Sequence, residues 1–257
     1  MSEVTPATHR FDTLDADEIS ATIAQLARRI DERLPGASLA RLCRRLEHIA
    51  RHTKDQVEWI KRPILSLRVG SGILILIVIV GLAMPFAAVG LSTGDATIID
   101  IIQALEAGIN DVVLIGAGIF FLATLENRIK RRRALAALHQ LRTITHIIDM
   151  LQLTKDPERL FHQWHPTPSS SAITLTPFLL SRYLDYCSDM LSLTGKIAAL
   201  YVQDFHDPVA LATVNEIETL ATGLTGKIWQ KLVILHAHPD VGPARSGAGS
   251  GVLPVTS

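Results

Sequence analysis

Apolar residues recur at spacings of three and four along most of the chain, which is the period of amphipathic α-helices. One stripe consists of Ile19, Ile23, Leu26, Ile30 and Leu34. After a break at Pro35-Gly36, a second stripe runs from Leu39 to Ile60. No segment has a convincing period of two, which is typical of half-buried β-strands. The pattern therefore predicts an all-α protein.

Three further amphipathic helices are predicted in the second half of the chain. The stripe from Leu138 to Leu151 directly follows an apolar run, so we expect one unbroken helix there. Thr176-Pro177 and Asp207-Pro208 each place a capping side chain before a first-turn proline, which marks the start of a helix. From about Pro239 the chain is rich in glycine, serine and proline, and this composition favours a disordered tail.

Two apolar runs are candidates for membrane spans. Val69 to Leu91 is 23 residues without a charge, which is long enough to cross a bilayer core of roughly 30 Å. Val112 to Leu125 has only 14 residues and would be too short by itself. Because basic clusters flank the pair of runs, we interpret both as spans of one transmembrane hairpin.

The charges on either side of these runs predict the orientation. Residues 37–68 contain eight Lys/Arg and three Asp/Glu, and residues 126–142 contain six and one. The connecting segment contains no basic residue and four acids, which are Asp95, Asp100, Glu106 and Asp111. Lysine and arginine are enriched in cytoplasmic loops. We therefore expect a multi-pass protein of the inner (cytoplasmic) membrane with both termini in the cytoplasm.

These patterns divide the chain into five parts. They are a flexible N-terminus (1–14), a cytoplasmic helical hairpin (15–62), a transmembrane hairpin (63–133) whose acidic extracytoplasmic loop spans 92–111, a cytoplasmic helical bundle (134–238), and a disordered tail (239–257). The expected fold is thus a two-span hairpin attached to a helical bundle that is built from N- and C-terminal segments.

Motifs for catalysis, metals and cofactors are absent from the sequence. LTGKI occurs twice, at residues 193–197 and 224–228, but lacks the other glycine and the Ser/Thr of a phosphate-binding loop. Cys187 is flanked by Asp185 and Asp189, which disfavour a reactive thiolate. The histidines lie on separate segments without zinc-ligand spacing. The formal charge is zero, so nothing indicates nucleic acid. We expect no enzyme, no cofactor and no metal.

The acidic segment suggests a functional role. Residues 97–100 have the form of a capping box, and Ile98, Ile102, Leu105 and Ile109 then share one helical face, with Gly108 at a possible bend. Such a short amphipathic helix would either lie on the outer membrane surface or shape the mouth of a pore. Since the second apolar run is short, either a polar group approaches apolar depth at one of its ends or the bilayer thins locally around it. The pore or vestibule candidates are Asp111, Asn110, Glu106, Asp100 and Glu126.

A pore needs several copies of a two-span chain, and small residues permit close helix packing in a bilayer. The packing candidates are Gly70, Gly72, Ala83, Ala87, Gly116 and Gly118. The basic run after the second span predicts a topology anchor that also attracts anionic lipid. Its members are Arg128, Lys130, Arg131, Arg132 and Arg133.

Two functions are therefore expected from the sequence. The first is a non-enzymatic homo-oligomer that conducts cations through a pore with an acidic outer vestibule. The second is a membrane-anchored adaptor or scaffold whose helical bundle binds a cytoplasmic protein partner. The expected partners are further copies of the chain, membrane lipids and, in the second case, that protein.

Overall fold

The computed structural model describes residues 13–91, 98–160 and 175–237. No strand occurs within these ranges, so the all-α prediction is confirmed. Residues 1–12 of the predicted N-terminus (1–14), the predicted tail (239–257) and part of the acidic segment lie outside them. The helices are α1 (Ala16–Arg33), α2 (Ser38–Lys61), α3 (Leu65–Leu91), α4 (Ile98–Leu153), α5 (Pro177–Leu200) and α6 (Pro208–Ala237), with a 3₁₀ turn at Pro157–Leu160.

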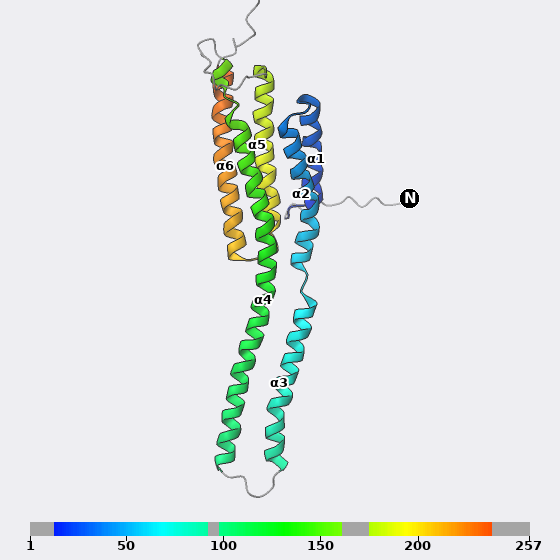
Figure 1. Ribbon diagram of the computed structural model, residues 1–257, viewed down its shortest axis with the longest axis vertical. Coiled ribbons are helices and arrows are strands. Elements are labelled where there is room, and N and C mark those ends of the chain that lie inside the picture. Colours follow the sequence, from blue (N-terminus) through cyan, green and yellow to red (C-terminus); the bar gives the residue numbers. More distant parts are fainter. Residues whose placement is uncertain (1–12, 92–97, 161–174, 238–257) are drawn as a thin grey trace, which may run out of the picture.

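The molecule is an elongated bundle with a two-helix extension (Figure 1). The bundle contains α1, α2, α5, α6 and the C-terminal half of α4. The extension is an antiparallel hairpin of α3 and the N-terminal half of α4. Because α4 belongs to both parts, one continuous helix joins the extension to the bundle.

One continuous core holds the bundle together. The predicted stripe of α1 is buried in it, with Ile23 and Ile30 at 0% exposure. Leu138 and Leu141 of α4 and Met190 of α5 are equally inaccessible. Tyr201, at the end of α5, is also buried, and its hydroxyl donates a hydrogen bond of 2.6 Å to Oε1 of Gln56 on α2. The first and last thirds of the chain are therefore parts of one packed unit.

Local sequence signals place the helix ends as expected. The Asp15 side chain accepts hydrogen bonds from the first turn of α1. Oγ1 of Thr176 accepts a bond of 3.3 Å from the Leu179 amide at the start of α5. Gly36, between α1 and α2, has φ +73°, a left-handed conformation that favours glycine. These caps bond backbone groups that helix ends leave without partners.

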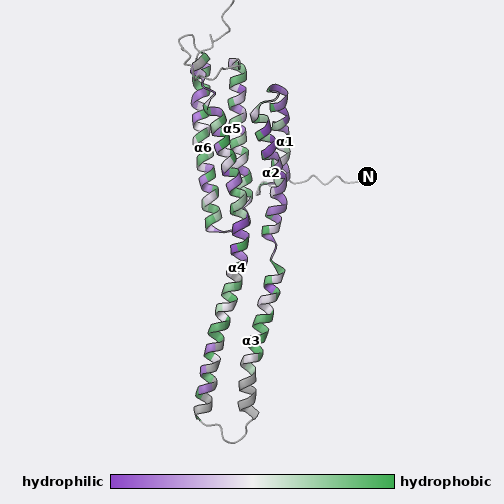
Figure 2. Ribbon diagram, in the orientation of Figure 1, coloured by the Kyte–Doolittle hydropathy of each residue, from purple (hydrophilic) through white to green (hydrophobic). Residues whose placement is uncertain are grey.

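The extension presents apolar side chains outward. One helical stretch through α3 and one through α4 are long and apolar enough to cross a membrane, and none of the most apolar window of either is buried in the protomer. Ile77 and Phe120 are examples, with exposures of 62% and 73%. Figure 2 shows hydrophobic stretches along both helices of the extension and a hydrophilic band where α4 enters the bundle. Such surface is normal in contact with lipid and unusual in water.

Helix α4 is longer than the predicted second span. It runs without interruption for 56 residues, about 84 Å, so there is no break at Gly108. More than half of the predicted loop 92–111 is therefore helical and continues the apolar run. The prediction of one unbroken helix from this run into the bundle is correct. The predicted helix that leads into the second apolar run is present from Ile98 onward, but it continues α4 without the possible bend at Gly108, because a single glycine costs only about 1 kcal/mol of helix propensity.

We expect Leu138→Ala to lower the free energy of unfolding of the bundle by about 2–5 kcal/mol, because it removes a fully buried side chain and leaves a cavity. Met150→Ala, on the same helix at 61% exposure, should change it by less than about 0.5 kcal/mol. Denaturant unfolding of the purified protein, followed by circular dichroism, measures both. Equal effects would contradict the core assignment.

Candidate functional site

Contacts within the extension fix how α3 and α4 are aligned. A Cβ added to Gly118 of α4 would lie 3.0 Å from Cδ2 of Leu74 on α3. Nearer the bundle, the Ile64 amide, just before α3, donates a hydrogen bond of 3.3 Å to Oε1 of Glu126. These pairs give antiparallel registers that agree to within two residues, as expected for two helices that rise equally per residue. For any residue of α4, the α3 residue at the same height along the long axis of the extension can therefore be identified.

This register places polar positions of α4 beside the middle of the apolar run of α3. The backbone of Asp111 is level with about Val80, halfway along the run Val69–Leu91. Glu106 is level with about Pro85 by the same count. The sequence alone placed Asp111 at the outer end of the second span, whereas the paired helices place it near mid-length of the first.

The described polar side chains at this level are exposed in the protomer. Gln103, Glu106 and Asn110 are spaced by three and four residues, so they share one face of α4, and all three are exposed. The side chains of Asp100 and Asp111 are outside the described part of the structure. Four of the five pore candidates thus lie on α4 between the middle of the extension and its end farther from the bundle.

Glu126 lies at the opposite end of the extension from the other four candidates. Its carboxylate is 2.9 Å from Nζ of Lys130 and 4.0 Å from Nε of Arg68. It also accepts the Ile64 amide hydrogen bond, which connects it to the start of α3. Twenty residues of helix, about 30 Å, separate it from Glu106, so the two cannot line one vestibule. Glu126 instead holds α3 and α4 together beside the bundle.

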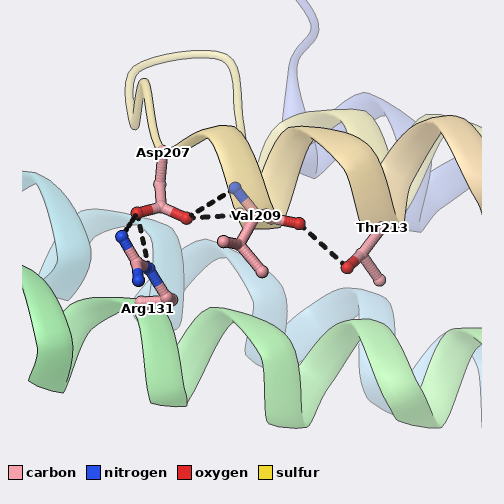
Figure 3. A network of polar contacts seen from close by, with 5 residues as sticks. Arg131, Asp207, Val209 and Thr213 are labelled. Carbon is pink, nitrogen blue, oxygen red and sulfur yellow. Dashed lines mark hydrogen bonds and ion pairs between the residues drawn. The ribbon is translucent and has the colours of Figure 1, made fainter.

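A second polar contact connects α4 to the loop between α5 and α6 (Figure 3). Nε and Nη2 of Arg131 both lie 2.7 Å from Oδ2 of Asp207, which is 5% exposed. The other oxygen, Oδ1, accepts the amides of Val209 and Ala210 at 3.1 and 3.0 Å and so caps α6. Asp207 was identified from the sequence only as a helix cap, and its partner 76 residues away had no local signal.

The basic residues that follow the apolar stretch of α4 fall into two groups, those with a partner in the protein and those without a described one. Lys130 pairs with Glu126, Arg131 with Asp207, and the guanidinium of Arg133 lies 3.7 Å from the ring centroid of Trp59 on α2. Arg128 and Arg132 are exposed and have no ion pair with any described residue. Three members of the predicted anchor therefore stabilise the protein itself, and two remain for other ligands.

The small residues of the extension also differ from one another. Gly118 is used within the protomer, because Leu74 occupies the space beside it. At Gly70, Gly72 and Gly116 an added Cβ would meet no atom within 4 Å. Ala83 is exposed, and the side chain of Ala87 lies outside the described part. Gly118 thus explains the close approach of α3 and α4, while the other glycines face open space.

The bundle has a trough along α5, between α1 and α6. One cavity of about 440 Å³ lies on the α1 side, and a cavity of about 400 Å³ lies on the α6 side. Both are lined by Arg182, Asp185 and Asp189 of α5, and exposed Trp229 of α6 borders the second. Shielding from water and the nearby Asp185 carboxylate raise the pKa of Asp189. The trough is polar along its floor and has one large aromatic at its edge.

We expect Asp207→Asn to weaken the contact between α4 and the α5–α6 loop. Asparagine keeps the capping oxygen but loses the charge that pairs with Arg131, so unfolding should cost about 1–2 kcal/mol less. Hydrogen exchange should rise in the first turn of α6. Asp204→Asn is a matched control, since its pair with Lys61 is 45% exposed on both sides and should change stability by less than about 0.5 kcal/mol. Equal exchange in the two variants would contradict the assignment.

Comparison with known proteins adds no family to these observations. No protein-family model, no curated protein and no solved structure matches the chain. Three features of the chain bear on its function. They are the level of the polar residues along the extension, the two polar contacts at its bundle end, and the trough of α5.

Proposed function

We propose that this protein is a non-enzymatic, two-span inner-membrane protein whose copies assemble into a cation-conducting pore lined by the polar face of α4. The observation that carries the proposal is the level of Glu106, Asn110 and Asp111 beside the middle of the apolar run of α3. Ionisable groups at such a depth face protein or water rather than lipid, and they commonly mark ion pathways.

The membrane placement is supported by the exposed apolar surface of the extension and by the charges at its two ends. Basic residues are concentrated where the extension meets the bundle, whereas all charged residues at its far end are acidic. Because basic residues favour the cytoplasmic side, the bundle and both termini lie in the cytoplasm. The reversal between α3 and α4 then lies outside.

Assembly follows from the exposed polar face of α4. If Val69–Leu91 crosses the hydrocarbon, Glu106 and Asn110 would contact lipid in a single protomer, because both are exposed. A charged group at the bilayer centre costs about 2.5–3.5 kcal/mol on insertion scales. Copies that turn this face toward a common water-filled axis avoid the cost. The open surface at Gly70, Gly72 and Gly116 permits the close approach of neighbouring helices.

An acid from each copy then forms a ring around the axis. Rings of carboxylates concentrate cations and are used for selectivity in cation channels. Glu106 supplies such a ring on the polar face of α4. Asp111, one to two turns nearer mid-depth, lies about 140° around the helix from Glu106 and about 100° from Asn110, so it borders this face. Asp100 is level with about Leu91, at the outer end of the apolar run, where water and salt weaken its influence over about 8 Å.

The topology can be tested with single cysteines at Thr93 and Ser170. We expect an impermeant maleimide to label Thr93→Cys, but not Ser170→Cys, in intact spheroplasts. The native thiols should give little background, because both are buried and burial raises the pKa of Cys43 to about 12 and that of Cys187 further still. Thiolate, the reactive form, is thus scarce at pH 7. The reverse labelling pattern would overturn the orientation.

The pore can be tested by flux measurements on purified protein in liposomes. Asp111→Asn and Glu106→Gln keep side-chain size and remove a charge. Glu106→Gln should lower the preference for cations over anions severalfold, and Asp111→Asn, at the border of the polar face, should lower it less, while the oligomer stays intact by native mass spectrometry. Asp100→Asn is the matched control and should have a smaller effect because its charge is screened. Monomers only, or no cation flux above that of empty liposomes under voltage, pH and osmotic challenge, would contradict the proposal.

The trough of α5 favours a second candidate, a membrane-anchored adaptor. Its floor offers both charge signs, and exposed Trp229 is the kind of residue that dominates protein interfaces. In that case the spans only position the bundle near the membrane. Absence of flux, combined with a photocrosslinker at Ser188 in the trough that captures one protein while a crosslinker at exposed Thr143 on α4 does not, would favour it.

A further inference from the structure

A groove on α4 lies where the extension meets the bundle. It has a volume of about 320 Å³ and is lined by Phe120, Thr124, Asn127, Arg128 and Arg131. These residues are spaced by three and four, so they follow one side of the helix for about 16 Å. The groove thus crosses from the apolar run, which ends at Leu125, into the basic run that follows it.

The bundle end of the groove offers cationic donors. Arg128 is exposed and has no ion pair with a described residue, and Arg132, one turn farther on, is in the same situation. Arg131 contacts Asp207 through Nε and Nη2, so its Nη1 is not used in that pair. The Asn127 amide is also exposed. Guanidinium groups and amide N–H groups are the donors that proteins use for phosphate.

The other end of the groove is apolar. Phe120 is 73% exposed, and the Thr124 hydroxyl donates a hydrogen bond of 2.7 Å to the Phe120 carbonyl, which leaves no free donor there. A ligand that fits the whole groove therefore needs an anionic head and an apolar tail. A free phosphate ion would satisfy only the first of these requirements.

We propose that this groove binds an anionic phospholipid of the cytoplasmic leaflet, with its phosphate at Arg128 and Arg131 and an acyl chain along Phe120. This inference rests on the membrane placement proposed above, and not on conduction. The charge balance selects the lipid class: Arg128 and Arg132 remain without acidic partners, so a zwitterionic headgroup would bring a cation toward them. Lys130 and Arg133 take no part, because they are held by Glu126 and Trp59.

The full-length protein, purified in mild detergent, can be titrated with phosphatidylglycerol and with phosphatidylcholine and followed by native mass spectrometry. We expect phosphatidylglycerol to bind more tightly, and Arg128→Gln to weaken its binding about fivefold or more. Arg62→Gln is the matched control. Arg62 is a comparably exposed arginine near the same level, at the end of α2, but it pairs with Glu58 and lies outside the groove. It should change the affinity less than about twofold.

Three results would overturn the proposal. Equal losses in Arg128→Gln and Arg62→Gln would show diffuse attraction to the basic surface. Equal binding of the two lipids would remove the phosphate selectivity. If millimolar inorganic phosphate displaced bound phosphatidylglycerol as effectively as added phosphatidylglycerol does, the groove would be a site for the free ion. Liposome flux measured on Arg128→Gln separates the two ideas, because unchanged conduction with lost lipid binding supports the groove, and lipid binding without any conduction contradicts only the pore.

Discussion

The architecture depends on the continuity of α4. One helix of 56 residues supplies half of the apolar extension and one wall of the bundle, so the backbone passes from the extension into the bundle core without a break. A helix is stiff along its axis because each turn is hydrogen-bonded to the next. A rotation of α4 about its own axis at the level of Asp111 would therefore tend to displace Leu138 and Leu141, which pack against the other bundle helices.

Charge pairs at the base of the extension add to this stiffness. Glu126, which accepts the Ile64 amide and lies 4.0 Å from Nε of Arg68, fastens α3 to α4, and Asp207 with Arg131 fastens α4 to the first turn of α6. Partly buried pairs of this kind hold orientation more than they add stability, because desolvation offsets much of their attraction. Their position at the predicted membrane boundary suits a protein in which events among the spans reach the bundle, under either proposed function.

The polar face of α4 and the phospholipid groove reflect the same constraint. A helix that crosses from hydrocarbon to water has apolar side chains in the first and polar side chains in the second. A polar side chain within the apolar part needs water or another polar group as its partner. Glu106 and Asn110 are such side chains within the apolar span, and we assign them to a water-filled axis shared by several copies. Arg128 lies where the apolar run of α4 is followed by the basic run, and the partner that we propose for it is a lipid phosphate.

Much of the fold could be predicted from the sequence, because helical period, caps and charge-free length are local properties. The buried stripe of α1, the starts of α5 and α6 and the two apolar helices were all evident from spacing. The partners of Glu126 and Asp207, and the use of Gly118 against Leu74, were decided only by tertiary structure, since they join residues far apart in the chain. The level of Asp111 is the clearest case. In the sequence, Asp111 lies just outside the short apolar run of its own helix. Only the antiparallel pairing of α4 with the longer apolar run of α3 places its backbone beside the middle of an apolar run.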